Sequence, residues 1–402
     1  MSDTARIIVT LTEPVAAGKR LRTDFVQDTY DHVPGTVLRG ALAARWIAEH
    51  GVEVTKSRDF LEVFEGSGSF APLHSEASVP APLSVKVHKY GPGPTCTTLW
   101  WDAATGDEQQ HCTACGDPLE FSKGAATGTV PRQRRTRTAL TTQGVAAESQ
   151  LFTQNSVARG TRFAGWLHGP ALRALRLAEQ PIDEVFLGGR TKLQGTAKIE
   201  LDDQSVPDPV EQHGNELVLR LLGPGVFVDR FGFPSSEPDL DELSEVLGVE
   251  ARSIKRPWTR WCEIGGWHVA SGLPKPTERA VQAGSTYRIK LAEPADEDAR
   301  RRLMARGIGL RRREGFGALY SVGQAPVTAY RVANRAAAMR GDSRLAEDRP
   351  LLRQRVDDMR HGLVDDSRFA ERLAVDDRYS TGLRALLRVV DPQLFSDALD
   401  VL

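Results

Sequence analysis

Apolar and polar residues follow two different periods along the 402-residue chain. A β-branched run predicts a strand at residues 6–11, a mostly apolar run predicts one at 216–222, and alternation predicts one at 287–291. A further strand is expected at 198–201. Apolar residues three or four positions apart predict a helix at 37–50. Further helices are expected at 171–178, 239–247 and 296–305. Thr36 and Gly51 are the residues expected to cap the first helix. Interspersed helices and strands predict an α+β fold.

Other segments are less regular. Residues 150–153 and 161–167 are expected to pair as strands, 226–228 to continue a second sheet, and 318–322 to form a short strand. Residues 202–215 contain three Asp and two Pro and predict an exposed linker. Residues 329–402 contain little glycine, and their apolar spacing predicts a small helical extension.

Two glycine-rich basic segments occupy similar places behind predicted helices. Residues 307–317 read GIGLRRREGFG, and residues 186–195 read FLGGRTKLQG. Each has a pair of glycines six positions apart, Gly189 with Gly195 and Gly309 with Gly315. This spacing indicates an internal repeat of about 120 residues, and therefore two related α+β halves.

The chemistry of these segments favours a phosphate-bearing ligand. Glycines let a backbone approach a ligand closely, and Arg311, Arg312 and Arg313 supply forked donors. The spacing matches neither the dinucleotide fingerprint nor the phosphate loop of nucleotide hydrolases. A nucleic-acid backbone is therefore the expected ligand. The competing interpretation is a tight turn whose arginines are solvated.

Residues 66–130 lack periodicity and predict an insertion that contains candidate metal ligands. Cys112 and Cys115 form a CxxC turn followed by glycine, which is typical of structural zinc sites. Cys96 is the expected third ligand and His88 the expected fourth, with His111 and His74 as weaker candidates for the fourth position. Free thiols and a redox role are the alternatives, although Pro118 and the surrounding glycines disfavour a thioredoxin-like motif.

The densest basic cluster follows the insertion. Arg132, Arg134, Arg135 and Arg137 lie within six residues, and threonine alternates with arginine toward the end of the run. The pattern predicts an extended arm that can lie along phosphates. A solvated charge run is the alternative. A second mixed segment carries Trp258, Trp261 and Trp267 among arginines, and we expect these rings to pack in the core.

Composition limits the remaining possibilities. The formal net charge is −1, so any nucleic-acid site is a local patch and not a global field. The sequence shows no signal-peptide pattern and no apolar run long enough to span a bilayer. Four cysteines in such a chain predict a cytoplasmic protein with reduced thiols or metal ligands.

Four of these motifs, in this order, resemble the RAMP superfamily of CRISPR-associated proteins. They are the turn and helix at 33–40 (VPGTVLRG), the block from Leu151 to Gly165, the Gly188-Gly189-Arg190 loop, and Gly315-Phe316-Gly317. With the cysteine-containing insertion they look most like the type III-D subunit that holds the 5′ tag of the guide RNA. The resemblance covers roughly residues 1–325. In relatives, a cysteine precedes lysine where His88 stands here.

The resemblance implies two ferredoxin-like (RRM-like) folds, at 1–205 with the insertion and at 216–325, followed by the extension at 329–402. It implies a non-catalytic, guide-RNA-binding subunit that caps a type III interference complex in antiviral defence, beside other RAMP subunits and the large subunit. Zinc is the one expected cofactor, and it is structural. The expected RNA-contacting residues are Arg39, Arg132, Arg134, Arg135, Arg137, Gly188, Gly189, Arg190, Lys192, Gly309, Arg311, Arg312, Arg313, Gly315, Phe316 and Gly317.

An enzyme is the alternative. Some RAMP proteins are metal-independent endoribonucleases that use a histidine near the first helix, and His32 stands in such a place with Tyr30 close by. An imidazole suits proton transfer near neutral pH. An unrelated RNA-binding protein, and glycine loops that only dock subunits, are further readings of the same residues.

Overall fold

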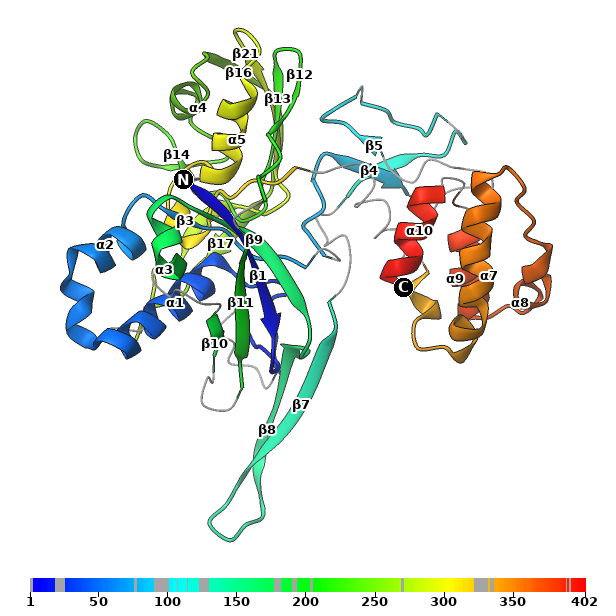
Figure 1. Ribbon diagram of the computed structural model, residues 1–402, viewed down its shortest axis with the longest axis horizontal. Coiled ribbons are helices and arrows are strands. Elements are labelled where there is room, and N and C mark those ends of the chain that lie inside the picture. The colour runs from blue at the N-terminus through cyan, green and yellow to red at the C-terminus, as the bar shows by residue number, and fades with distance from the viewer. Residues whose placement is uncertain are drawn as a thin grey trace. The chain divides into compact units, whose positions relative to one another are not determined.

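The computed structural model describes residues 3–18, 26–75, 78–89, 101–106, 108–113, 115–122, 130–176, 182–189, 194–202, 205–268, 271–321, 332, 336–387, 389 and 392–402. These residues form a mixed α+β protein with several sheets (Figure 1). The chain divides into two compact units, residues 1–76 with 130–321, and residues 77–129 with 322–402. The domain boundaries expected from sequence, and the two ferredoxin-like folds, stay predictions.

The first unit contains a five-stranded antiparallel sheet in its N-terminal half. Its strand order is β10 (Ile182–Phe186), β11 (Thr196–Asp202), β1 (Thr4–Leu11), β9 (Arg162–His168) and β3 (Ser69–Phe70). Alternate residues of β1, among them Ile7 and Val9, are fully buried and pack with the helices α1 (Gly35–His50) and α2 (Arg58–Glu65). Short helical turns η1 (Val52–Lys56), η2 (Gly169–Leu172) and α3 (Arg173–Arg176) complete this half.

The helix α1 begins differently from the expectation. Pro34, and not Thr36, occupies the N-cap position, and no side chain caps the helix. Thr36 lies inside the first turn because Pro34, with φ −59° and ψ 145°, already sets the change from extended to helical backbone. The C-terminal end is as expected, since Gly51 has φ 81°. Leu38, Leu42 and Trp46 form its buried stripe.

A long hairpin projects from this half (Figure 1). Its strands are β7 (Arg132–Leu140) and β8 (Ala146–Val157), and β2 (Val26–Gln27) pairs with β8 in parallel. Residues 150–153 therefore pair with β7 and not with 161–167, which was the expectation. The reason lies in the side chains: β9 alternates buried Phe163 and Leu167 into the core, whereas β7 is polar and mostly exposed.

The C-terminal half of the same unit has a four-stranded sheet, in the order β12 (Glu211–His213), β13 (Glu216–Arg220), β21 (Thr286–Leu291) and β16 (Ala251–Trp258). The helices α4 (Leu240–Leu247) and α5 (Glu297–Arg306) contribute to its core. Two-stranded ribbons pair β14 (Phe227–Val228) with β15 (Pro234–Ser235), β17 (Trp261–Ile264) with β20 (Glu278–Val281), and β18 (Trp267–His268) with β19 (Leu273–Pro274).

Three expectations for this region were wrong. Residues 226–228 join the β14–β15 ribbon and do not continue the sheet. Residues 202–215 contain the strand β12, so they are not only a linker. In the described part of 318–322, Leu319 makes a single bridge to Leu221 and no strand. A fourth expectation, that three tryptophans pack in the core, was wrong in part, since Trp258 is buried but Trp261 and Trp267 are 42% and 50% exposed.

The predicted repeat also differs between its two copies. The segment 186–195 joins the antiparallel strands β10 and β11, because β10 intervenes between the short helix α3 and the loop. The segment 307–317 instead follows α5 directly. The shared glycine spacing therefore does not reflect a shared helix–loop–strand unit.

The second unit has two described parts. A small sheet pairs β4 (Val85–His88) with β5 (Trp101–Asp102) and β6 (Leu119–Phe121). The C-terminal part is helical, as expected, with η4 (Ala337–Met339), α7 (Ser343–Arg360), η5 (Ser367–Phe369), α8 (Ala370–Ala374), α9 (Arg378–Leu387) and α10 (Pro392–Val401) around a core of its own. Among the described residues, no helix is long and apolar enough to cross a membrane.

Candidate nucleic-acid interface

The late glycine-rich loop, residues 307–317, is tied to the body of the protein by ion pairs. Arg311 contacts Glu314 through Nε at 3.0 Å and Glu278 through Nη1 at 3.0 Å. Arg312 pairs with Glu242, and Arg313 donates to the carbonyl oxygen of Glu65 at 2.8 Å. The three arginines are thus partly compensated within the chain, and RNA contact by them stays a prediction.

Glu314 is the centre of this network. Its carboxylate is 8% exposed and accepts hydrogen bonds from Lys275 at 2.6 Å and from Arg311. Burial raises the pKa of Glu314, but the hydrogen bonds from Arg311 and Lys275 outweigh it and bring the pKa to about 2. The carboxylate is therefore ionised at neutral pH and holds the loop in place. Phe316, also buried, supports the loop beneath the guanidinium of Arg311, 4.7 Å from its ring centre.

The glycines of this loop face protein atoms at close range. A Cβ on Gly315, which has φ +87°, would lie 2.6 Å from the carbonyl oxygen of Phe70 and 2.9 Å from Cα of Gly35. A Cβ on Gly309 would lie 2.6 Å from the carbonyl oxygen of Val226. Gly317 is equally tight against Ile308. The loop therefore packs against the start of α1, which brings together two of the motifs that the sequence resemblance used.

Arg39 points to the same junction. It donates through Nε to the carbonyl oxygen of Phe64 at 2.7 Å and pairs with Glu65, the acidic residue that Arg313 also approaches at 3.5 Å. Arg39 and Arg313 thus join α1, the end of α2 and the late loop. In this structure Arg39 has a structural partner, and its expected contact with RNA stays a prediction.

The first glycine-rich loop is described only in part. Gly188, with φ +79°, lies against the carbonyl oxygen of Ala16, and the Gly189 amide donates to that same oxygen at 3.0 Å. A Cβ on Gly189 would meet open space. Arg190 and Lys192 lie outside the described residues.

The β7–β8 hairpin, which we call the arginine hairpin, carries four arginines on β7. Arg132 approaches Asp28 at 3.4 Å. Within the described part of the chain, no acidic residue pairs with Arg134, Arg135 or Arg137. Arg134 and Arg135 are exposed, and Arg137 is half-buried.

An aromatic ring accompanies two of these arginines on one face of the hairpin. Arg137 is opposite Phe152 in the strand register, and Arg135 is opposite Gln154. Directly opposed residues share a face, so Arg135, Arg137 and Phe152 lie on one side and Arg134 on the other. Phe152 is 40% exposed. Arginine beside an exposed ring is a surface on which unpaired bases can stack.

Tyr30 and His32 form an aromatic cluster just before α1. The ring of His32 stacks on that of His74 at 4.5 Å and lies 4.9 Å from that of Tyr30. Its Nδ1 is 3.2 Å from the carboxylate of Asp31. The hydrogen bond with His32 lowers the pKa of Asp31 to about 2, against the opposing effect of burial. A carboxylate that orients an imidazole is compatible with acid–base chemistry and equally with a structural role.

Three of the four expected metal ligands come together in the second unit. The donor atoms of His88, Cys112 and Cys115 all lie within 4.8 Å of one another, with Cys115 Sγ 3.4 Å from His88 Nε2. β4 carries His88, and the tight turn before β6 carries the cysteines, where the Gly116 amide donates to the Cys112 carbonyl at 2.8 Å. Cys96 lies outside the described residues. His111 is exposed and is not in this group, and His74 is in the first unit.

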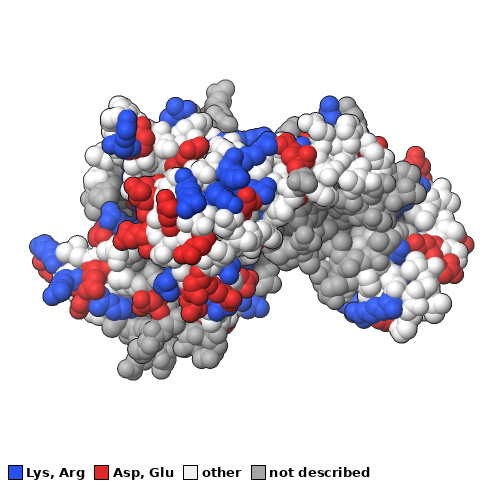
Figure 2. Space-filling view, turned by 90° about the horizontal axis from the view of Figure 1, so that it is seen from above, with Lys and Arg blue, Asp and Glu red and all other residues white. Residues whose placement is uncertain are grey.

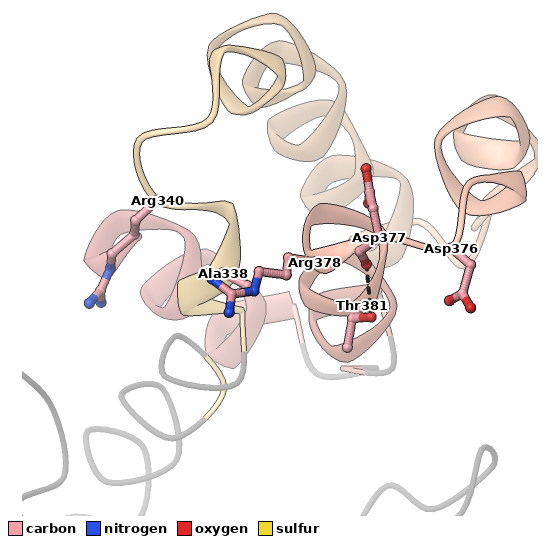
Figure 3. A pocket seen from close by; sticks show the side chains of 6 residues that line it. All are labelled: Ala338, Arg340, Asp376, Asp377, Arg378 and Thr381. Atoms are coloured by element: carbon pink, nitrogen blue, oxygen red, sulfur yellow. Dashed lines mark hydrogen bonds between the residues drawn. The ribbon is translucent and has the colours of Figure 1, made fainter.

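An open hollow of about 640 Å³ lies in the C-terminal helical part (Figure 3). Arg340, Asp376, Asp377 and Arg378 line it together with Ala338 and Thr381, whose hydroxyl donates to the Asp377 carbonyl at 2.9 Å. Two arginines and two aspartates give the lining no excess of either charge. It therefore does not favour a polyanion.

Sequence reasoning missed the acidic residues of the first unit. Glu65, Glu242 and Glu278 are distant in sequence from the arginines that they compensate. Among the acidic partners of the loop arginines, only Glu314 could be recognised from the sequence, because it lies within the loop itself. Phe152 was also missed as an exposed ring, because a phenylalanine in a predicted strand ordinarily packs inward.

Residues 130–323 match the family described as CRISPR-associated protein (Cas_Cmr3). No curated protein sequence matches the chain. Among solved structures, a chain of the Type III-B Cmr-beta complex bound to cognate target RNA and AMPPnP has a TM-score of 0.41 at 13% identity, covering 70% of this chain and 86% of that one.

Two further structures have lower TM-scores. A Cas6-related protein from Pyrococcus furiosus has a TM-score of 0.33 at 11% identity, covering 80% of this chain and 99% of that one. A chain of the Csm3–Csm4 subcomplex of the type III-A interference complex has a TM-score of 0.34 at 11% identity, covering 73% and 95%. At such TM-scores the structural likeness supports no conclusion about function.

Proposed function

We propose that the chain is a non-catalytic, RNA-binding RAMP subunit of a type III CRISPR complex, and the match of residues 130–323 to the CRISPR-associated family (Cas_Cmr3) supports this. In this proposal it holds the 5′ tag of the guide RNA and caps the assembly in antiviral defence, as the sequence resemblance to type III-D subunits implies. Its partners are the guide RNA, other RAMP subunits and the large subunit.

The arginine hairpin is the observation that carries this proposal. Arg134, Arg135 and Arg137 have no acidic partner among the described residues, whereas each arginine of the late loop has one. Uncompensated arginines bind phosphates without first giving up an internal ion pair. Phe152 adds a ring beside Arg137. The hairpin is therefore the primary RNA contact, and the late loop chiefly holds α1 and α2 in place.

A gel experiment tests the proposal. The full chain is incubated without metal with labelled single-stranded repeat RNA, and samples are run on both native and denaturing gels. We expect retention of intact RNA that is lost as salt rises, because phosphate contacts release counterions. Absence of binding at low salt would contradict the proposal.

The histidine cluster motivates the second candidate, a metal-independent endoribonuclease with His32 as general base and Tyr30 beside it. The Asp31–His32 contact at 3.2 Å is the specific observation in its favour. The denaturing gel decides between the two functions. Cleavage at one position that disappears in His32→Ala would establish the nuclease, and intact RNA with both proteins would exclude it under these conditions.

We also propose that His88, Cys112 and Cys115 hold a structural zinc ion, with Cys96 as the fourth ligand. Zinc–sulfur and zinc–nitrogen bonds of about 2.3 and 2.0 Å place tetrahedral ligands roughly 3.3 to 3.8 Å apart. The 3.4 Å between Cys115 Sγ and His88 Nε2 fits that range. Such an ion would join the turn before β6 to β4 and stabilise an insertion with a small apolar core.

Elemental analysis tests the zinc proposal. Purified protein is expected to carry about one zinc per chain, and Cys112→Ser to carry much less, because removing a buried thiolate leaves an incomplete site. Cys262→Ser is the matched control, since Cys262 lies in the first unit on β17 and burial raises its pKa to about 11. Zinc-free protein that folds normally would contradict the proposal.

A further inference from the structure

Charge alone does not single out a further binding surface. Over the face that Figure 2 shows, Lys and Arg side chains are interspersed with Asp and Glu, in keeping with the formal net charge of −1. Exposed aromatic rings are more informative, because a large ring in water forgoes the free energy that its burial would release. One such ring is that of Trp261 on β17, which is 42% exposed.

The hairpin formed by β17 and β20 is fixed to the late loop by one face, which we call its inner face. Ile264 and Ala280 pack there with Phe316 of the loop. Glu278, which is opposite Ile264 in the strand register, pairs with Arg311 of the loop at 3.0 Å. The backbone of the hairpin is therefore held in place, and so are the positions from which its outer side chains project.

The outer face of the same hairpin presents a stack of two flat groups. Trp261 and Glu263 are alternate residues of β17, and Arg279 is opposite Glu263, so all three lie on this face. The guanidinium of Arg279 lies 4.8 Å from the ring centre of Trp261. Among the described residues no ion pair joins Arg279 to Glu263, although the register places them side by side. Arg279 thus covers the indole instead of neutralising the carboxylate.

This stack fits an unpaired nucleotide better than it fits a protein. An apolar protein surface would remove the guanidinium and the carboxylate from water without giving either a partner, which is costly. A base can stack on an exposed indole or on a guanidinium plane while its sugar and phosphate stay in water. Arg279 and Glu263 cancel in charge, so the flat groups and not the charge provide the attraction.

We propose that Trp261 and Arg279 form a stacking site for one unpaired base of single-stranded RNA, separate from the arginine hairpin. This inference rests on the proposed RNA-binding function and deepens it by naming a second contact of a different kind. The arginine hairpin supplies charge to phosphates, whereas this site supplies a flat surface to a base. Stacking releases no counterions, so the contact adds affinity that is insensitive to salt.

Fluorescence anisotropy with the full chain and a labelled single-stranded RNA of mixed sequence tests the inference at several salt concentrations. Trp261→Leu keeps an apolar side chain but removes the ring, and it is expected to bind about tenfold more weakly. The slope of log affinity against log salt should not change, because no phosphate contact is lost. Trp261→Phe is the matched control, since it keeps a ring, and its affinity should stay close to that of the wild-type chain.

A second variant tests the guanidinium without changing the charge. Arg279→Lys keeps the positive charge and loses the flat plane, so it should weaken binding about threefold at an unchanged salt slope. The side chain is exposed, so the unfolding temperature should not change. Circular dichroism of each variant checks that the chain has remained folded.

Four outcomes would overturn the inference. Wild-type affinity in Trp261→Leu, while the arginine-hairpin variants lose affinity, would overturn the stacking site alone. Equal losses in Trp261→Leu and Trp261→Phe would show that the indole acts by packing and not by stacking. Self-association of the wild-type chain that Trp261→Leu abolishes, at unchanged RNA affinity, would assign the ring to a protein contact. Failure of the wild-type chain to bind RNA would overturn the proposed function as well.

Discussion

Replacing Arg134, Arg135 and Arg137 together with alanine is expected to weaken the binding of single-stranded RNA by about 10- to 100-fold. These arginines have no acidic partner among the described residues, so their charge is available to phosphates. Their side chains project from a two-stranded hairpin and contribute nothing to a buried core. The unfolding temperature should therefore change little. Binding is measured by anisotropy at fixed salt, and folding by circular dichroism.

The control for this experiment removes the same number of charges elsewhere. Arg45, Arg301 and Arg360 each pair with an acidic residue on the same helix, and we expect their joint replacement by alanine to leave RNA binding unchanged. Phe152→Ala separates stacking from charge, since it should weaken binding without altering the salt dependence. A hairpin triple variant that binds RNA like the wild-type chain would remove the main support for the proposed interface.

Glu314→Gln is expected to destabilise the first unit by about 3 kcal/mol at neutral pH. The substitution leaves the guanidinium of Arg311 and the ammonium of Lys275 without the carboxylate that now accepts from both. The late loop would also lose its anchor against α1, where Gly315 and Gly35 meet. The urea midpoint of unfolding measures the loss, and Glu53→Gln, at an exposed pair with Lys56, is the control.

The loss of stability in Glu314→Gln should depend on pH. The pKa of Glu314 is lowered from 4.5 to about 2 in the folded chain. A lowered carboxyl pKa adds stability that is present above the unfolded value and is lost as pH falls toward the folded value. The difference in stability between the wild-type chain and Glu314→Gln should therefore shrink between about pH 4.5 and pH 2. A difference that stays constant over this range would show that Glu314 acts through packing and not through its charge.

Local patterns predicted most of the regular elements. The strand β1, the helices α4 and α5, and the helical C-terminal part depend on alternation and on caps such as Asp239 and Asp296, which are local properties. Pairing between strands was predicted less well. Residues 150–153 and 161–167 are neighbours in sequence but pair with different strands, since partners are chosen by which faces are buried.

The candidate site also has features that the sequence predicts and features that it does not. The arginine hairpin and the CxxC turn are dense local clusters, so the sequence by itself determined which residue types gather there. Whether an arginine is available to a ligand depends on acidic residues far away in the chain. Arg312 pairs with Glu242 and Arg313 with the Glu65 carbonyl, contacts that no local pattern reveals.

The sequence alone determined an α+β chain with a polar, cysteine-containing insertion, a helical C-terminal part and a basic arm. Each of these follows from the spacing and chemistry of residues close together along the chain. Only the tertiary structure decided that the glycines of the late loop pack against α1, that the loop arginines are compensated, and that the guanidinium of Arg279 lies over the ring of Trp261 on the neighbouring strand. The physical reason is that charge compensation and close packing depend on distances in space, which the order of residues does not specify.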